Sequence, residues 1–388
     1  MTGAIGKTLY EKSHFIRKCD AYLRRTPVLS PLRIDHNVAA ENEVGQGIEN
    51  LQVLWPAEKV SFEPTENEQK FLKIAKYFND GFYFRPNIFV CEVPQAYLHI
   101  GTGLVCTRDF KAVNESQMEY RLRNNPHFKT FKPLAIKRLK GTYYSTINNI
   151  FSHQWQHWTV DCLTRLYSLS RAYPDQRIVL LTPSGLRKDW NESLTAALPP
   201  NFEIQHLSGE TWVQVDRLIL PSYVSARANH HLPPGYYDTM RQTTFARLGL
   251  PPKTESQERI YVSRSMAAWR RILNEEELLE LLGRYGFKSI LLEKMAFRDQ
   301  VDLFRRAEVV AGAYGSNWGN NIYSGKIKNF VLYADRQPEP HVFTLTKGLG
   351  QEHFFLAGDV TDVHADITAN LGEVERVLRE EMNLRPVA

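Results

Sequence analysis

The C-terminal part of the chain alternates short apolar segments with amphipathic segments of roughly 10–15 residues. We expect strands at 259–263, 287–292, 309–312, 329–333 and 353–356, and helices at 274–285, 297–307 and 363–382. Strands separated by helices of this length are joined by right-handed crossovers and lie parallel in one sheet. This alternation predicts a Rossmann-like lobe.

A similar alternation begins at residue 141. Helices are predicted at 157–173 and 183–198, and strands at 177–181, 202–207 and 215–220. The segment 225–256 between the two series carries the pairs His230-His231, Pro233-Pro234 and Pro251-Pro252 around one predicted helix, 236–248. This segment is the best candidate for a domain boundary.

The sequence therefore predicts an α/β protein with two Rossmann-like lobes facing each other across a cleft. A ligand would bind at the carboxyl ends of the strands. Short apolar pieces between residues 80 and 110 predict a small β-rich element on the N-terminal side. We divide the chain into an unassigned extension (1–80), a first lobe (81–235) and a second lobe (236–388), whose final helix could pack back on the first lobe.

Composition narrows the class of protein. Of 388 residues, 43% are hydrophobic and 23% are charged, as in ordinary folded proteins. The formal net charge of +5 is too small to indicate a nucleic-acid-binding protein. The scattered cysteines form no Cys-x-x-Cys pair, which argues against a disulfide scaffold or a thiolate zinc site. No apolar run approaches the roughly 20 residues of a membrane span, so we expect a cytoplasmic protein.

A glycine-rich stretch, GAYGSNWGNN at 312–321, follows a predicted strand and leads into a helix. Glycines let the backbone approach a ligand closely, and a helix start offers free N–H groups to a phosphate or carboxylate. The stretch has neither the Gly-Lys-Ser/Thr of a Walker loop nor the spacing of the dinucleotide fingerprint. On its own, a turn that packs a helix onto the sheet is an equally good interpretation.

A second polar cluster begins at the end of the strand at 259–263. Four arginines and no acidic residue occur between Arg259 and Leu273. Arginines at the mouth of a parallel sheet can hold a pyrophosphate through paired, charge-assisted hydrogen bonds. Asn274 with Glu277 also fits a helix N-cap and its capping-box partner, which is the more frequent role for such an Asn.

Two histidines and an aspartate lie one helical turn apart. His153 and His157 could face one metal, but no third ligand is evident, so we predict no metal site. His157 and Asp161 also share a helix face, and an imidazole beside a carboxylate can act as a general base. On spacing alone the simpler interpretation is a helix start with Trp155 and Trp158 in the core and Asp161 as a surface charge.

Residues 121–140 are basic, with seven Lys or Arg, no acidic residue, and Phe128 and Phe131 interleaved. A solvated face is the usual meaning of such a stretch. A peripheral contact with anionic lipid headgroups at the inner face of the membrane, or with a polyanionic acceptor, is the sharper hypothesis. RNA binding is a third interpretation of the same stretch.

In their order along the chain, these clusters resemble the motifs of glycosyltransferase family 61. The family signature Asn-x-x-His-Trp-x-x-Asp/Glu-x-x-x-Arg-Leu is similar to Gln154, His157, Trp158, Asp161, Arg165 and Leu166, with Gln replacing Asn. A family Ser-Arg…Arg-x-x-Asn-Glu stretch is matched by Ser263, Arg264, Arg271, Asn274 and Glu275. A Gly-Phe, an acidic residue and a helix are matched by Gly286-Phe287, Glu293 and 300–307.

The last family block, Gly-x-His-Gly-Ala-Gly-Leu-Thr-Asn, is only partly matched. The corresponding residues are Gly312, Tyr314, Gly315, Ser316, Asn317, Trp318, Gly319 and Asn320. Tyr replaces His, so the chain resembles a divergent branch of the family. The resemblance extends over roughly residues 80–360. The family that it indicates includes bacterial capsular-polysaccharide proteins, plant xylosyl- and arabinosyltransferases and animal O-linked N-acetylglucosaminyltransferases.

The resemblance implies a two-lobed GT-B fold and sugar transfer from a nucleotide donor, UDP-linked by expectation, to a glycan or glycolipid hydroxyl in bacterial surface polysaccharide synthesis. It implies inversion at the anomeric carbon without a metal or other cofactor. Asp161 is the expected base, with His157 as alternative or partner. The expected nucleotide-sugar-binding residues are Ser263, Arg264, Arg271, Asn274, Glu275, Gly312, Tyr314, Gly315, Ser316, Asn317 and Asn320.

Two other functions remain compatible with two such lobes. A nucleotide-sugar epimerase would isomerise a sugar without any acceptor. A non-catalytic subunit would bind a glycan or nucleotide and transfer nothing, with the altered glycine-rich stretch marking a degenerate lobe.

Overall fold

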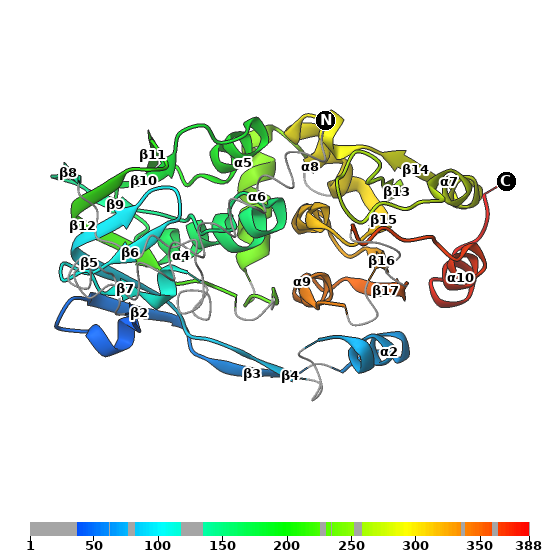
Figure 1. Ribbon diagram of the computed structural model, residues 1–388, viewed down its shortest axis with the longest axis horizontal. Helices are drawn as coiled ribbons and strands as arrows, with labels where there is room; N and C mark the ends of the chain where they lie inside the picture. The colour runs from blue at the N-terminus through cyan, green and yellow to red at the C-terminus, as the bar shows by residue number, and fades with distance from the viewer. Residues whose placement is uncertain are drawn as a thin grey trace, which may run out of the picture.

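The computed structural model describes residues 37–61, 63–76, 82–117, 135–225, 230–233, 235–251, 258–334, 338–358 and 364–387. These residues form two large sheets, each with its own helices, which lie side by side along the long axis of the molecule (Figure 1), and one small two-stranded sheet. We call the ten-stranded sheet with its helices the first half, and the five-stranded sheet with its helices the second half.

The sheet of the second half is entirely parallel in the described residues, as its alternating pattern predicts. Its strands are β13 (Glu258–Val262), β14 (Phe287–Ile290), β15 (Ala307–Ala313), β16 (Lys328–Tyr333) and β17 (Glu352–Ala357). Their order is β14-β13-β15-β16-β17. The order reverses between β13 and β15, and in open parallel sheets ligands bind at the carboxyl ends of the strands beside such a reversal.

Helices cover both faces of this sheet. On the outer face, α7 (Glu275–Arg284) packs against α10 (Leu371–Arg376), which continues as a π-helix, Val377–Glu381. The final helix therefore lies on the second half. On the face toward the first half lie α8 (Phe297–Arg306), a 3-10 helix (Ser316–Tyr323) and α9 (His341–Gly348).

The sheet of the first half is mixed rather than parallel throughout. Its strands are β1 (Asn37–Val38), β2 (Glu49–Trp55), β5 (Ile88–His99), β6 (Leu104–Cys106), β7 (Ala112–Val113), β8 (Lys137–Leu139), β9 (Tyr143–Ser145), β10 (Ile178–Pro183), β11 (Phe202–Leu207) and β12 (Trp212–Pro221). Strands β12, β9, β10 and β11 are parallel. Strands β2, β12 and β6 each pair antiparallel with β5, and β6 with β7.

The strands predicted at 177–181, 202–207 and 215–220 are present as β10, β11 and β12 and are parallel, joined through β9. Antiparallel pairing occurs on the β5 side of the sheet, which includes the predicted β-rich element. Strands β5 and β6 are joined by a tight turn, which only antiparallel neighbours allow. Gly103 in this turn has a φ of +67° and lies so close to Asn148 that any side chain would collide with the Asn148 carbonyl. The predicted β-rich element is part of this sheet because β5 pairs with β12 over most of its length.

The helices of the first half meet those of the second half directly. They are a π-helix (His157–Leu163), α4 (Arg165–Ala172), α5 (Lys188–Ala197) and α6 (Tyr236–Leu248). A continuous apolar core passes between the halves. The Trp155 ring lies 4.8 Å from that of Trp190 in the first half and 6.1 Å from that of Phe297 in the second.

A ribbon of two strands, β3 (Glu58–Ser61) and β4 (Phe82–Arg85), carries α2 (Glu66–Ile74) across to the second half (Figure 1). Helix α2 begins with a capping box between Thr65 and Glu68. Its Phe71 ring stacks on Phe343 and meets the edge of Phe355. Part of the unassigned extension thus packs on the second half. Short 3-10 helices occur at Ala40–Glu43, Asn114–Ser116 and Leu292–Lys294.

Among the described residues, no helix is both long enough and apolar enough to cross a bilayer. Most of the basic stretch at 121–140 lies outside the described residues. Its last residues include β8, which pairs parallel with β12.

Candidate active site

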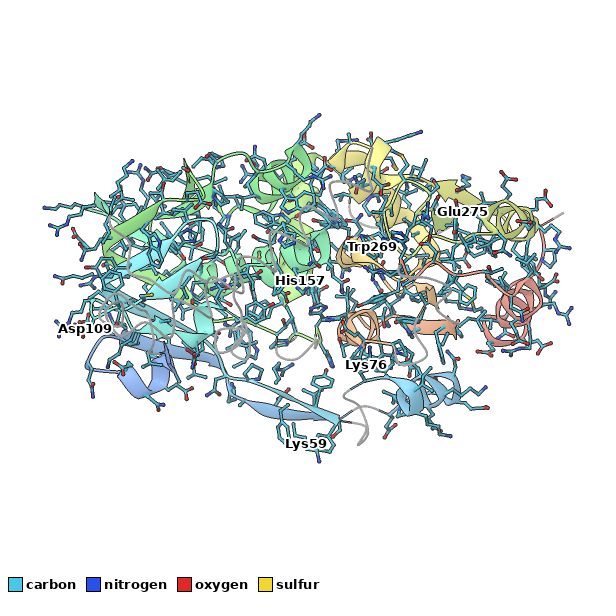
Figure 2. The ribbon with its side chains drawn as sticks, in the orientation of Figure 1. Lys59, Lys76, Asp109, His157, Trp269 and Glu275 are labelled. Carbon is cyan, nitrogen blue, oxygen red and sulfur yellow. The ribbon has the colours of Figure 1, made fainter. Side chains whose placement is uncertain are left out.

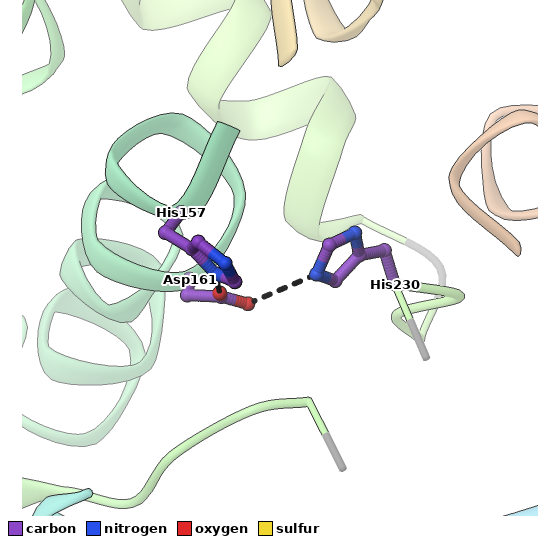
Figure 3. A group of neighbouring side chains, drawn as sticks. All are labelled: His157, Asp161 and His230. Atoms are coloured by element: carbon purple, nitrogen blue, oxygen red, sulfur yellow. Dashed lines mark hydrogen bonds and ion pairs between the residues drawn. The ribbon is translucent and has the colours of Figure 1, made fainter. Parts of the chain in front are cut away.

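His157 and Asp161 lie on one face of the π-helix, as their spacing predicts (Figure 3). The Nδ1 atom of His157 is 2.6 Å from Oδ2 of Asp161. The Thr159 hydroxyl donates to the carbonyls of Trp155 and Gln156. Such back-bonding competes with the regular ladder, and π-helical turns are frequent at functional sites.

Asp161 is completely buried, so the interpretation as a surface charge is wrong. Its Oδ1 accepts a hydrogen bond of 2.6 Å from the Ser225 hydroxyl and lies 3.5 Å from Nε2 of His230. Burial alone would raise the pKa of Asp161, but the nearby His230, the hydrogen bond from His157 and that from Ser225 hold it well below its usual range. Asp161 is therefore a carboxylate with both oxygens engaged.

His230 comes from the segment between the predicted lobes and faces Asp161 across from the π-helix (Figure 3). Burial lowers the pKa of its imidazole to about 3, although the Asp161 charge opposes this effect. Gln156 lies 3.2 Å from its Nδ1. Of the three side chains only that of His157 reaches the surface, with 13% of its area exposed. A neutral His157 with Nδ1 held by Asp161 presents Nε2 as a proton acceptor.

His157, Asp161 and His230 are the described side chains whose ligand atoms lie close enough together to hold a metal ion. Two ligand atoms of one zinc ion, each about 2.0–2.2 Å from it, lie roughly 3 Å apart. The 2.6 Å separation of His157 Nδ1 and Asp161 Oδ2 is that of a charge-assisted hydrogen bond. The arrangement fits a shared proton better than a shared metal. His153 is exposed and bonds instead to the Ile150 carbonyl.

The remaining residues of this motif build the support for the pair. Trp155 and Trp158 are buried, as predicted, and the Trp158 indole donates to Ser193. Arg165 is fully buried and donates to the carbonyls of Ile147, Asn148 and Pro221, which fixes the ends of β9 and β12 against the helix.

In the second half, Ser263 and Glu275 are brought together at the end of β13. The Glu275 carboxylate accepts from the hydroxyls of Ser263, at 3.0 Å, and Tyr261, at 2.8 Å. This pairing fixes the start of α7 against β13 and leaves the Ser263 backbone at the point where the sheet order reverses.

Arg271 and Asn274 have partners within the protein. Arg271 donates through Nε and Nη2 to Asp366, at 2.9 and 2.6 Å. The Asn274 side chain makes no cap for α7, so the predicted capping box is wrong. It exchanges two hydrogen bonds with the backbone of Ala369, because the 364–370 segment lies against the helix start.

Arg264 lies across the backbone of Gly315, where any side chain would collide with its guanidinium. Its Nη2 donates to the Trp269 carbonyl at 2.9 Å, and its buried Nε has no partner. Burial, and then the nearby charge of Arg270, lower the pKa of Arg264 to about 10. Glycine suits position 315 because a Cβ there would overlap Nη1 of Arg264.

Arg270 adopts a left-handed conformation, with a φ of +58°, that few non-glycine residues adopt. Its guanidinium lies 5.1 Å from the centre of the Tyr314 ring. Within the described ranges, neither Arg264 nor Arg270 has a carboxylate within ion-pair distance. Arg270 is one of the four arginines that the sequence places at the mouth of the sheet, but the family motif is matched by Arg271.

The glycine-rich stretch joins the two groups of residues. Its 3-10 helix packs so tightly on the π-helix that a Cβ on Gly319 would lie 2.5 Å from Thr159 Oγ1. Asn320 accepts from the Trp155 indole at 2.6 Å. Both amide atoms of Asn317 are buried without a partner. The backbone rises only about 8 Å along the 3-10 helix between Gly315 and Gly319. Gly315 lies under Arg264 and Gly319 lies against the π-helix, so this short helix links the two groups of residues.

The other predicted residues of the stretch line the same connection. Gly312 packs on the Val262 carbonyl, so the glycine closes the gap between β13 and β15. The Tyr314 ring stacks on Tyr333, and burial raises the pKa of the Tyr314 hydroxyl. Ser316 begins the 3-10 helix and is half-buried. We call the segment 263–274 between β13 and α7, which carries Arg264, Arg270 and Arg271, the arginine loop. In Figure 2, His157 lies near the junction of the two halves, with Trp269 of the arginine loop toward the second half.

A hollow of about 530 Å³ lies elsewhere, between α7 and α10. Its charged lining is Glu277, Glu280, Arg284 and Glu375. Three carboxylates against one guanidinium would repel a diphosphate, so this hollow is a poor match for the arginine chemistry described above.

Residues 155–329 match the model of the family described as Glycosyltransferase 61. The match begins at the π-helix and ends in β16, so it spans both the His157–Asp161 pair and the arginine loop. No curated protein matches the chain.

Proposed function

The match to glycosyltransferase family 61 makes this chain a glycosyltransferase, and we propose that it transfers a sugar from a nucleotide-sugar donor to a hydroxyl group of a glycan or glycolipid. The proposed architecture is of the GT-B type, with residues 81–235 on the acceptor side and 236–388 on the donor side. We further propose inversion at the anomeric carbon, a UDP-linked donor and no metal requirement.

The observation that carries the donor half of this proposal is a pair of unneutralised arginines beside the reversal of the parallel sheet. Arg264 and Arg270 lie near each other there without an ion pair among the described residues, although the charges of Glu293 and Asp366 act on Arg264 from farther away. Both amide atoms of Asn317 are buried and lack a partner. Clustered cations cost free energy unless an anion joins them, and guanidinium groups suit the paired oxygens of a diphosphate. In this proposal they replace a metal ion in stabilising the leaving group.

His157 is the proposed base, with Asp161 as the residue that positions it. Asp161 is fully buried and bound by three side chains, so it does not reach an acceptor. Nε2 of His157 would take the proton of the acceptor hydroxyl while its oxygen attacks C1 of the sugar. The bond from C1 to the diphosphate oxygen breaks, its electron pair leaves with the diphosphate, and the Asp161 carboxylate stabilises the resulting imidazolium.

The acceptor class and cellular setting rest on the family resemblance alone. We propose a bacterial capsule or other surface glycan as acceptor, made at the cytoplasmic face of the membrane. Residues 121–140 would supply the peripheral contact with anionic lipid.

Ligand-induced thermal stabilisation with UDP-, GDP- and CMP-sugars tests the donor half. A ligand that binds only the folded state raises the Tm, so one nucleotide class should do so in the wild type and fail in Arg264→Ala. His206→Gln, on an edge strand of the first half, is the matched control. Stabilisation by no nucleotide would contradict the proposal.

Transfer is then measured with the stabilising donor and a panel of glycan acceptors, with and without EDTA. Product should form only with an acceptor present and equally in EDTA. Sugar isomerisation without an acceptor would indicate an epimerase, and nucleotide binding without turnover would indicate a binding subunit. Loss of activity in EDTA with recovery in Mn²⁺ would refute the metal-free mechanism.

A further inference from the structure

A second imidazole–carboxylate pair faces the first from the other half of the molecule. His341 is the first residue of α9, and its Nε2 lies 3.2 Å from a carboxylate oxygen of Glu339. Its ring centre lies 6.0 Å from that of His157, with the two ring planes nearly perpendicular, and 5.0 Å from that of His230. The two halves thus each present one histidine backed by one carboxylate.

Helix α9 is held firmly in this place. The Thr344 hydroxyl accepts a hydrogen bond of 2.9 Å from the backbone N–H of His230, which ties the helix to the first half. The side chain of His341 is 12% exposed, almost the same fraction as that of His157. Its Nδ1 is buried and has no hydrogen-bond partner in the described part of the chain.

The His341 pair is also continuous with the arginine cluster. Burial raises the pKa of the Tyr314 hydroxyl, and the nearby negative charge of Glu339 adds to this effect. Tyr314 also contacts the arginine cluster, because the Arg270 guanidinium lies 5.1 Å from the centre of its ring. A row of side chains therefore leads from His157 through His341, Glu339 and Tyr314 to Arg270.

A comparison with another buried histidine of the second half shows what the carboxylate adds. His353 has a ring contact with Phe343 and lies 3.4 Å from the Tyr333 hydroxyl, and burial followed by the nearby Lys347 lowers its pKa to about 3. It stays neutral. His341 differs from His353 in having a carboxylate 3.2 Å from its Nε2, so Nδ1 is the ring nitrogen that has no partner among the described residues.

We propose that His341 is a second catalytic residue, which donates a hydrogen bond from Nδ1 to a non-bridging oxygen of the donor diphosphate. This inference rests on the proposed function. As the bond from C1 to the diphosphate breaks, negative charge grows on the phosphate oxygens, and the His341 imidazolium offsets it. His157 ends the step with the acceptor proton, His341 keeps its own, and the nucleoside diphosphate leaves with the bonding electron pair.

The geometry limits how the two rings share one substrate. With 6.0 Å between ring centres, no sugar ring fits between His157 and His341. Each ring therefore acts through the nitrogen opposite its carboxylate, Nε2 of His157 and Nδ1 of His341, with the sugar lying across the mouth of the pair. The titratable groups facing His341 are His157 and His230 from the first half and Glu339 from the second.

Proton-linked calorimetry separates this role from simple packing. Binding of UDP, GDP and CDP is measured near pH 8 in two buffers of different ionisation enthalpy, which gives the number of protons taken up on binding. The wild type should take up a proton with the diphosphate that binds. His341→Gln should lose this uptake and bind about 10- to 100-fold more weakly, as expected for loss of a charge-assisted hydrogen bond.

Glu339→Gln is the second variant, because this half-exposed side chain can change without disturbing the core. It should reduce proton uptake while leaving the imidazole in place. His157→Gln should keep the uptake, and so should the control His206→Gln. Unchanged uptake and affinity in both His341→Gln and Glu339→Gln would overturn this inference and leave the proposed function standing. Failure of the wild type to bind any nucleoside diphosphate would overturn both.

Discussion

The two halves of the molecule treat buried charge in opposite ways. In the first half, Asp161 is hydrogen-bonded to His157 and Ser225 and lies beside His230, so its negative charge is stabilised by polar side chains of the protein itself. In the second half, the charge of Arg270 acts on the buried Arg264, and among the described residues neither arginine forms an ion pair.

This difference assigns a separate task to each half. A charge satisfied from within fixes the geometry of a neighbouring group before any substrate arrives, as Asp161 fixes His157. Uncompensated charges of one sign raise the free energy of the empty protein and are relieved by a ligand of the opposite sign. The first half is built to hold a proton, and the second to receive an anion.

The largest expected effect comes from removing the base. His157→Gln should lower kcat by about 10²–10⁴-fold, because general-base catalysis contributes that much, while the Kd for the nucleoside diphosphate stays unchanged. Asp161→Asn should lower the rate to a similar extent, since it leaves the imidazole without the carboxylate that orients it and stabilises its charge. Steady-state kinetics and calorimetry on the same preparations measure both quantities.

Full transfer activity in Asp161→Asn would remove Asp161 from the mechanism. Full activity in His157→Gln with loss of it in Asp161→Asn would return the role of base to the aspartate and show that the buried carboxylate becomes accessible during the reaction.

Removing an arginine should act on binding instead. Arg264→Ala should weaken binding of the nucleoside diphosphate by ~2–5 kcal/mol, since the lost partner of a buried charge pair costs that much. The matched variant Arg271→Ala should leave the affinity for the nucleoside diphosphate nearly unchanged. It should lower the free energy of unfolding, because Arg271 forms an ion pair with the buried Asp366. Equal losses of affinity in the two variants would contradict the distinction between them.

The fold of the second half could be predicted closely from the sequence because its signals are local. Strand β13 and helix α8 each fall within one or two residues of their predicted bounds, since a buried parallel strand and an amphipathic helix are both written in periodicity. The same holds for helix α6 of the first half, which agrees residue for residue with the predicted 236–248. The antiparallel side of the first sheet could not be predicted, because the pairing of β5 with β12 joins residues more than a hundred positions apart.

In the candidate site, too, contacts between residues close in sequence could be predicted and contacts between distant segments could not. His157 and Asp161 are four residues apart, so the helical period brings them together and the sequence predicts the pair. Ser225 and His230 reach Asp161 from a segment whose paired prolines and histidines indicate only a linker. His341 was missed altogether, because α9 lies beyond a run of mixed residues without a clear strand or helix pattern.

Both halves bury neutral histidines, and this should make the whole protein sensitive to acid. Burial lowers the pKa of His230 and of His353 to about 3, whereas both would titrate near 6.5 in the unfolded chain. As the pH falls below 6.5, these histidines bind protons in the unfolded state but not in the folded state, so the free energy of unfolding decreases. Each of the two histidines should lower the free energy of unfolding by about 2 kcal/mol between pH 6.5 and 5.

Urea unfolding at pH 7 and pH 5 measures this loss. His353→Gln cannot titrate, so its free energy of unfolding should fall less between the two pH values than that of the wild type, by about 2 kcal/mol. An equal fall in the two proteins would show that His353 is not kept neutral in the second half.

The smallest effect tests the contact through which the halves meet. A Cβ on Gly319 would lie 2.5 Å from Thr159 Oγ1 and 2.9 Å from Gln156 Cα, so Gly319→Ala must push the 3-10 helix away from the π-helix. Overpacking of this kind costs about 1–3 kcal/mol. Gly283 in α7 has open space around it, so Gly283→Ala should stabilise the protein by ~0.5–1 kcal/mol. If Gly319→Ala were as stable as Gly283→Ala, the tight seam between the halves would not exist in solution. If Gly319→Ala is destabilised and also slows sugar transfer without weakening diphosphate binding, the contact between the 3-10 helix and the π-helix positions His157 relative to the arginines.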